Sequence, residues 1–202
     1  MTKSLPAGFW AIASGIATEE ELGEWMEKAA WADAWTFRTP EFSERKALAA
    51  LRRMKKQAPF LAVHGRLDWA IQSQADALVL GSRSLPWEEI AATAQKLNSP
   101  RPSGEAILQL GASVHNLQEV SRALQTGADF LVFGPVWATP SKEGILKPRG
   151  LQRLAEICTA GLPVVAVGGI QSPEQAKACI DEGAHAVAVL RAYDKTELTQ
   201  QR

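Results

Sequence analysis

Two glycines followed by a helix start are the clearest chemical signal in this 202-residue sequence. Gly168 and Gly169 end an apolar run, and Ser172 lies shortly after them in the pattern Ser-Pro-Glu-Gln. Glycines let backbone amides approach an anion closely, and a helix N-terminus adds oriented N–H groups. Ser as N-cap, Pro at the first helical position and Gln three residues after the cap are typical of a helix start. We therefore expect a phosphate site at Gly168 and Gly169; the alternative is a tight turn that binds nothing.

A second group of polar residues lies on a long connection, roughly 134–149. Thr139, Ser141 and Lys142 supply two hydroxyls and an ammonium group there. These side chains suit a further contact with a phosphorylated ligand, and the alternative is a solvated basic loop. Arg191 follows the last apolar run, and its guanidinium group would donate paired hydrogen bonds to the same ligand.

Two of the three histidines are placed for proton transfer. His64 ends the third apolar run, and imidazole titrates near neutral pH, so His64 is a candidate general acid or base. The alternative, to which we give equal weight, is that His64 is a polar residue at the rim of the site with no catalytic role. His115 follows the fifth run, where it is either a catalytic group or the cap of a helix that begins near Leu117. His185 opens the last run, and we expect a structural role for it.

Eight short apolar runs alternate with helix patterns along the chain. Such runs, bounded by Gly or Pro, are typical of strands buried on both faces. Four runs open with a related motif, and repeated strand–helix modules favour a closed barrel. We predict an α/β fold, a single (β/α)8 TIM barrel over residues 1–202, near the lower end of the length this fold needs. The motifs start at Trp31, Gln74, Gly127 and Gly183; the runs lie near 9–13, 31–35, 60–63, 74–78, 106–110, 127–131, 163–167 and 183–187.

In a TIM barrel the loops after the strands form the active site. Arg38, after the second run, and Ser113, after the fifth, therefore join the candidate binding residues. Three acids of the repeated motif, Asp33, Asp76 and Asp129, lie at strand starts, which is the opposite end of the barrel. Because Mg²⁺ prefers carboxylate oxygens near a phosphate, this distribution predicts no metal site.

The composition excludes several classes of protein. The 22 Lys and Arg residues balance 22 Asp and Glu residues, which argues against a nucleic-acid binder. No apolar run is long enough to cross a membrane, and no secretion signal is evident at the N-terminus. With two cysteines inside helix patterns, these features predict a cytoplasmic enzyme. The sequence leaves a homo-oligomer open.

Four motifs resemble those of the thiamine phosphate synthase/TenI superfamily. The resemblance is close over roughly 105–192 and weaker, but in register, over 9–98. It implies the (β/α)8 barrel predicted above. The motifs are Ser-Val-His at 113–115, Gly-Ala-Asp-Phe-Leu-Val-Phe-Gly-Pro-Val-Trp at 127–137, Thr-Pro-Ser-Lys at 139–142 and Pro-Val-Val-Ala-Val-Gly-Gly-Ile at 163–170.

The resemblance assigns roles to the second half of the chain. In the synthases, a Thr-x-Ser/Thr-Lys loop and a Gly-Gly turn hold the thiazole phosphate and the pyrophosphate. The residues that match those positions are Thr139, Ser141, Lys142, Gly168 and Gly169.

The first half departs from the synthases at three places. After strand 2 they carry Gln-x-Arg-x-Lys, of which this chain keeps Arg38 alone. After strand 3 they carry Asn-Asp, where this chain has His64 and Gly65. After strand 4 they carry an acidic magnesium ligand, where residues 81–86 are Gly-Ser-Arg-Ser-Leu-Pro. In synthases the missing Lys and acids bind magnesium pyrophosphate.

These departures favour the TenI-like branch, in which a metal-independent thiazole tautomerase moves a proton on a thiazole phosphate. We therefore predict an isomerase of thiamine biosynthesis with a small phosphorylated thiazole as its ligand and no cofactor. The catalytic histidine of that branch follows strand 6, where this chain has Pro135, so His64 is proposed as the acid or base, with His115 as the second candidate. The alternatives are a magnesium-dependent thiamine phosphate synthase, which joins hydroxymethylpyrimidine pyrophosphate to thiazole phosphate, and a non-catalytic thiazole or thiamine phosphate-binding protein.

Overall fold

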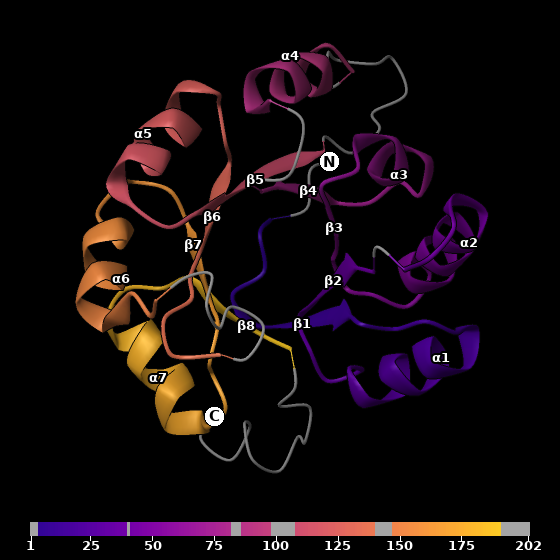
Figure 1. The fold of residues 1–202 in the computed structure, drawn as a ribbon, viewed down its shortest axis with the longest axis horizontal. Coiled ribbons are helices and arrows are strands. Elements are labelled where there is room, and N and C mark those ends of the chain that lie inside the picture. The colour runs from indigo at the N-terminus through magenta and orange to yellow at the C-terminus, as the bar shows by residue number, and fades with distance from the viewer. Residues whose placement is uncertain (1–3, 40, 82–85, 98–107, 140–146, 191–202) are drawn as a thin grey trace.

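The computed structural model is a closed barrel of eight parallel strands with helices outside it (Figure 1). It describes residues 4–39, 41–81, 86–97, 108–139 and 147–190, with the backbone alone for 94–97. Each strand pairs with the next in sequence, and β8 closes on β1. The predicted (β/α)8 barrel is confirmed.

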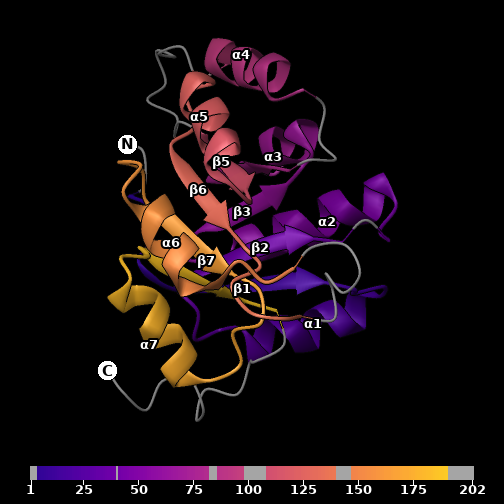
Figure 2. The ribbon, with the colours of Figure 1, turned by 60° about the vertical axis from the view of Figure 1, so that its left-hand side comes forward.

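Strands and helices alternate along the described chain, and the helices lie on the outer face of the strands in both views (Figures 1 and 2). The strands are β1 (Gly8–Ser14), β2 (Ala34–Arg38), β3 (Leu61–His64), β4 (Ala77–Leu80), β5 (Gln109–Val114), β6 (Phe130–Phe133), β7 (Val164–Val167) and β8 (Ala186–Val189). The helices are α1 (Glu19–Lys28), α2 (Glu44–Lys55), α3 (Leu67–Gln72), α4 (Trp87–Leu97), α5 (Leu117–Gln125), α6 (Gly150–Cys158) and α7 (Pro173–Asp181).

Each even-numbered strand begins at the fourth residue of its repeated motif, three residues later than predicted. In the first copy, the N–H of Asp33 donates to Phe9 O at 2.8 Å, and Asp33 Oδ2 accepts the N–H of Phe9 at 2.9 Å. The carboxylate therefore joins the starts of β1 and β2, because each backbone group there needs a partner when buried. The same pair of bonds recurs between Asp76 and Leu61 and between Asp129 and Leu110.

The fourth copy carries a histidine in place of the acid. The N–H of His185 donates to Val164 O at 2.8 Å, which preserves the backbone half of the motif. Its Nε2 lies 3.1 Å from Leu5 O, near the start of the chain. These contacts place His185 at the end of the barrel where the strands begin, as expected for a structural residue.

Large aromatic rings fill that end of the barrel from inside. Trp10 packs on Phe60 and Phe130, with ring centroids 5.6 and 5.7 Å apart. Gly111 makes room for Phe130, since a Cβ there would lie 2.4 Å from the ring of Phe130. The interior is filled at the strand starts, which leaves the strand ends as the place for a ligand.

Strand β5 begins later than the run predicted near 106–110. Gln109 pairs with Ala77 of β4 and Val114 pairs with Phe133 of β6, so β5 spans Gln109–Val114. As a result Ser113 lies within the strand and not after it. Among the described residues no helix combines the length and apolar character needed to cross a membrane.

Candidate active site

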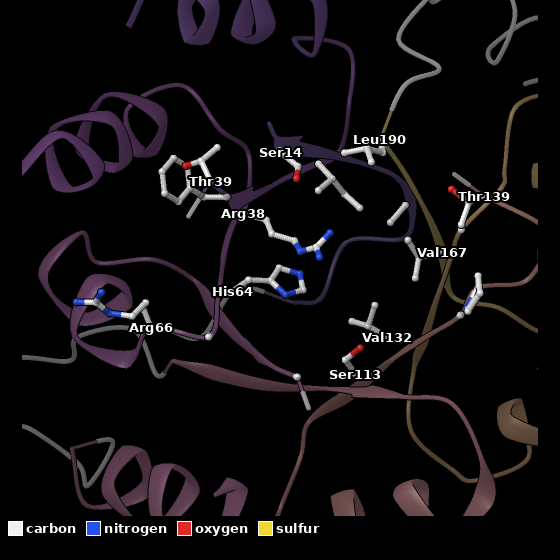
Figure 3. Close-up of a pocket in the computed structure, with 18 of the residues that line it drawn as sticks. Ser14, Arg38, Thr39, His64, Arg66, Ser113, Val132, Thr139, Val167 and Leu190 are labelled. Atoms are coloured by element: carbon white, nitrogen blue, oxygen red, sulfur yellow. The ribbon is translucent and has the colours of Figure 1, made fainter. Parts of the chain in front are cut away.

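A cavity of about 860 Å³ opens at the ends of the strands (Figure 3). Its lining includes most of the residues that the sequence singled out: Arg38, His64, Ser113, His115, Thr139, Gly168 and Gly169. The closed barrel thus brings together residues from the first half of the chain, such as Arg38, and residues from its last quarter, such as Gly169. Ser141, Lys142 and Arg191 lie outside the described residues.

Ser14, Arg38 and His64 form one side of the cavity, which we call the Arg–His wall. The register pairs Ser14 with Arg38 and Phe37 with Val63, so His64 is the next neighbour of Arg38. Neighbouring strands lie about 4.8 Å apart, and alternate residues point to the same face. Figure 3 shows the side chains of Arg38 and His64 extending together into the cavity.

The opposite side is formed by the loops after β6 and β7, and we call Gly134, Thr139, Gly168 and Gly169 the glycine wall. Gly168 and Gly169 have φ values of +98° and +72°, a backbone conformation that residues with a Cβ rarely adopt. A Cβ on Gly169 would lie 2.6 Å from Ala138 O, and a Cβ on Gly134 would lie 2.1 Å from Val167 O. These glycines let the two loops lie directly against each other.

Backbone hydrogen bonds hold the two loops of the glycine wall together. Val136 N–H donates to Val167 O, and Trp137 N–H donates to Gly168 O, each at 3.0 Å. Arg149 N–H donates to Pro135 O at 2.8 Å, which returns the chain to the start of α6. Thr139 is therefore positioned at the cavity rim by the backbone around it.

The start of α7 follows the pattern predicted from the sequence. Ser172 is the N-cap, Pro173 is the first helical residue, and Ser172 Oγ accepts the N–H of Gln175 at 3.3 Å. Gln175 Oε1 accepts the N–H of Gln171 at 2.7 Å. The side chains of Ser172 and Gln175 thus accept hydrogen bonds from N–H groups at the start of the helix. The Gly168–Gly169 turn is the part of this loop that presents only backbone to the cavity.

His115 connects the end of β5 to the loop that follows β6. Its ring Nδ1 lies 2.5 Å from Gly134 O, so this nitrogen carries the proton and donates to the carbonyl. Its backbone N–H donates to Glu119 Oε2 at 2.6 Å. The expectation that His115 caps the next helix is wrong, because Asn116 is the N-cap and its side chain accepts the N–H of Glu119.

The floor of the cavity is apolar. Hydrophobic residues from β1, β6, β7 and the end of β8 line it, while Ser113 contributes a hydroxyl beside Val132. An apolar floor packs against a flat ring and strengthens charge interactions above it, because the local dielectric is low. The apolar residues are Ile12, Val132, Val167, Ala188 and Leu190.

A polar cluster outside the Arg–His wall was missed by the sequence interpretation. Arg66 donates to Asp68 at 2.9 and 2.6 Å and to Glu44 at 2.9 Å, and it stacks over Trp69 with 4.3 Å to the ring centroid. The hydrogen bond to Asp68 is the main reason that the pKa of Arg66 is raised, and the same bond lowers the pKa of Asp68. The position of Arg66, two residues beyond a strand end, was the available signal.

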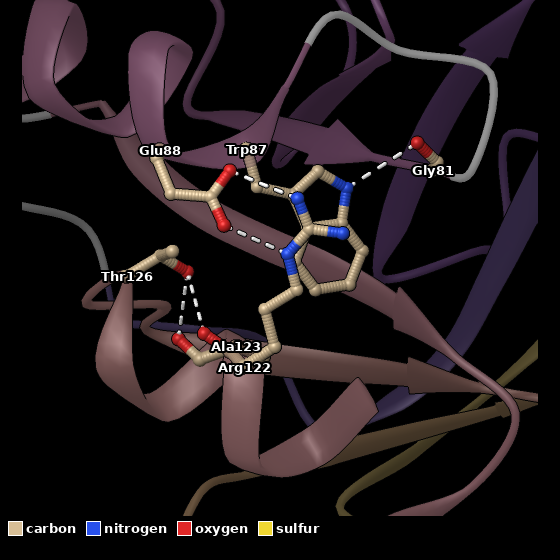
Figure 4. Close-up of polar contacts among 6 residues, drawn as sticks. All are labelled: Gly81, Trp87, Glu88, Arg122, Ala123 and Thr126. Carbon is tan, nitrogen blue, oxygen red and sulfur yellow. Dashed lines mark hydrogen bonds and ion pairs between the residues drawn. The ribbon is translucent and has the colours of Figure 1, made fainter. Parts of the chain in front are cut away.

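The end of β4 carries an indole contact (Figure 4). Trp87 Nε1 donates to Gly81 O at 3.3 Å, and Arg122 lies over the Trp87 ring at 5.2 Å. Arg122 also forms two hydrogen bonds with Glu88, at 2.8 and 2.9 Å. These contacts tie α4 and α5 to the strand end, and none of them places a carboxylate in the cavity.

The family comparison decides what kind of barrel this is. The family model described as thiamine monophosphate synthase matches residues 9–193. The chain belongs to this family.

Individual relatives agree with the family assignment. The thiamine-phosphate synthase of Salinibacter ruber is 32% identical over 142 residues, covering 70% of this chain and 58% of that protein. The corresponding enzyme of a Mycobacterium species is 33% identical over 154 residues, covering 73% and 63%. The chain therefore spans about three fifths of the length of these relatives. The solved thiamine phosphate pyrophosphorylase of Pyrococcus furiosus superposes with a TM-score of 0.75 at 26% identity, covering 95% of this chain and 90% of that one.

Proposed function

We propose that this chain is a transferase of thiamine biosynthesis that joins a pyrimidine pyrophosphate to a thiazole phosphate. The glycine wall is the observation that carries the proposal. Thr139, Gly168 and Gly169 match the synthase positions that hold the phosphates, and they line one cavity. The names of the relatives, thiamine-phosphate synthases, support the transferase over the isomerase that the sequence favoured.

The glycine wall suits the phosphate of the thiazole substrate. The amides of Gly168 and Gly169 and the hydroxyl of Thr139 are hydrogen-bond donors for phosphate oxygens. The apolar floor packs against the thiazole ring.

The coupling reaction needs charge stabilisation more than a base. The thiazole nitrogen attacks the methylene carbon of the pyrimidine, a C–N bond forms, and the C–O bond to pyrophosphate breaks with its electron pair leaving on pyrophosphate. The nitrogen has no proton to lose, so no residue must accept one. Arg38 and His64 are placed to stabilise the leaving pyrophosphate through hydrogen bonds and charge.

The residues do not fit the magnesium that the family implies. At the two positions where the synthases carry acids, this chain has Gly65 and the segment 81–86, whose sequence holds no Asp or Glu. Within the described ranges there is no group of three His, Cys, Asp or Glu residues that could hold a metal ion. We therefore assign no step to a metal.

A coupling assay tests the proposal. Purified protein is given hydroxymethylpyrimidine pyrophosphate and thiazole phosphate, with and without Mg²⁺, and thiamine phosphate is measured. We expect product that depends on both substrates. Binding of thiazole phosphate with no product would instead support the binding-protein alternative.

An isomerase is the second candidate, because His64 extends into the cavity. Pro135 stands where the tautomerases carry their histidine, so His64 is the first candidate for the base. His115 stays the second candidate, because its Nδ1–H donates to Gly134 O and Nε2 keeps its lone pair. Incubating a thiazole phosphate carboxylate tautomer with wild-type protein and with His64→Ala tests this; an equal rate in both proteins eliminates His64 as the base.

A further inference from the structure

We propose that the Arg–His wall binds a diphosphate group directly, through Arg38, His64 and Ser14 and without a divalent metal ion. This inference rests on the proposed transferase function, which accounts for the substrate that would bring a diphosphate there. The binding itself can be measured without turnover. The inference starts from the disagreement between the family's magnesium site and the residues in this chain.

The geometry places the three donors in one row. Ser14 pairs with Arg38 in the β1–β2 register, and Arg38 has His64 as its neighbour on β3. All three side chains line the cavity from strand ends, above the apolar floor. A guanidinium binds two phosphate oxygens at once, and an imidazole and a hydroxyl on either side reach further oxygens.

The carboxylates of the cavity are not arranged for Mg²⁺, which is held by one or two carboxylates beside the phosphates in octahedral geometry. Among the described lining residues the carboxylates are Glu41 and Glu44, and both come from the region of α2 rather than from strand ends. Glu44 accepts a hydrogen bond from Arg66 at 2.9 Å. At the end of β4 the residue that lines the cavity is Gly81, which has no carboxylate and whose carbonyl oxygen accepts a hydrogen bond from Trp87 Nε1.

Side-chain cations change how magnesium affects affinity. A site built from carboxylates binds diphosphate only after the metal has bridged the negative charges. A site built from Arg38 and His64 binds the bare anion, and Mg²⁺ in solution competes because it neutralises part of the diphosphate charge. The sign of the magnesium effect therefore separates the two kinds of site.

Isothermal titration of the whole protein with inorganic pyrophosphate tests the proposal, once with EDTA and once with saturating Mg²⁺. We expect binding in EDTA, with affinity equal or up to about tenfold weaker in Mg²⁺ because the bound metal reduces the charge of the ligand. Binding in Mg²⁺ alone, or binding that is tighter in Mg²⁺ than in EDTA, overturns it.

Substitutions locate the binding. Arg38→Gln is expected to weaken pyrophosphate binding in EDTA by more than about tenfold, and His64→Asn by about three- to tenfold, in line with the loss of charge-assisted and ordinary hydrogen bonds. Arg122→Gln removes the same charge from an exposed pair with Glu88 and should leave the affinity unchanged. Unchanged thermal unfolding shows that each variant is folded. Equal affinity of Arg38→Gln and Arg122→Gln overturns the assignment.

The two proposals fail separately. If pyrophosphate binds in EDTA but no thiamine phosphate forms under any condition, the transferase function fails and direct binding stands. If product forms and pyrophosphate binds in Mg²⁺ alone, the transferase stands and direct binding fails.

Discussion

The two walls of the cavity are built by different means. The glycine wall is backbone packed on backbone, with loops that meet where Gly134 and Gly169 have no Cβ. The Arg–His wall is a row of side chains on neighbouring strand ends. The glycine wall keeps the motif of the synthases, and the Arg–His wall keeps only Arg38 of the synthase signatures that follow strands 2 and 3.

This difference follows from how each wall tolerates change. A new Cβ in the glycine wall would collide with backbone atoms, so a change there disturbs two loops at once. A side chain at a strand end extends into an open cavity and can be exchanged without repacking the barrel. The Arg–His wall is therefore where a family member can alter its side chains while keeping the glycine wall.

The largest expected effect comes from Gly169→Ala in the glycine wall. The Cβ would lie 2.6 Å from Ala138 O at a φ of +72°. We expect a loss of about 3 kcal/mol in unfolding free energy, from overpacking and the left-handed backbone together. Thiazole phosphate binding should weaken by about tenfold or more, because the amides of the turn shift with it. Urea denaturation and titration measure the two quantities.

Gly161→Ala is the matched control for that variant. Its φ is +83°, but a Cβ there meets nothing within 4 Å. It should lose only about 1 kcal/mol, because the left-handed backbone alone opposes the side chain, and bind thiazole phosphate normally. Equal losses in the two variants would show that the close approach of the loops contributes nothing.

The next effect concerns the link between β5 and the glycine wall. His115→Ala removes the hydrogen bond to Gly134 O and should lower the unfolding free energy by about 1–2 kcal/mol. Turnover should fall several-fold, because Gly134 and Pro135 lose their support. Asn116→Ala removes the N-cap of α5 and should cost about 1 kcal/mol with no change in turnover. If both variants turn over at the same rate, His115 only stabilises the fold.

A smaller effect should follow from Thr139→Val. This change removes a hydroxyl at nearly constant volume, so thiazole phosphate binding should weaken about fivefold, the value of one hydrogen bond. Pyrophosphate binding at the other wall should be unaffected. Thr126→Val is the control, since the Thr126 hydroxyl donates hydrogen bonds to the carbonyls of Arg122 and Ala123 in α5 and does not line the cavity (Figure 4). Equal weakening of both ligands would mean that the two walls do not separate them.

The smallest effect tests the Arg–His wall from the side of its negative neighbour. Glu41→Gln removes an exposed negative charge that lines the cavity. Pyrophosphate affinity should be about twofold higher than in the wild type at low salt. The difference between the two proteins should vanish at about 0.5 M salt, because exposed charges are screened. Titrations at two salt concentrations measure it, and a rise that persists at high salt would contradict this explanation.

Several features followed from local sequence patterns. The alternation of apolar runs and helix patterns predicted the barrel, and Ser172 and Pro173 marked the start of α7 correctly. Strand boundaries were less accurate: β5 extends to Val114 because its last residues pair with β6. The repeated motif was interpreted as a strand start, since its apolar pattern carries no sign that Asp33 would bind the backbone of β1.

The sequence by itself determined the order of the elements and the starts of α5 and α7, because these depend on neighbours within a few positions. Only the tertiary structure decided that Arg38 lies beside His64, that His115 reaches Gly134, and that the loops after β6 and β7 touch through glycines. Those relations depend on strand register and barrel closure. Both are set by packing between residues far apart in the chain, where local propensity has no influence.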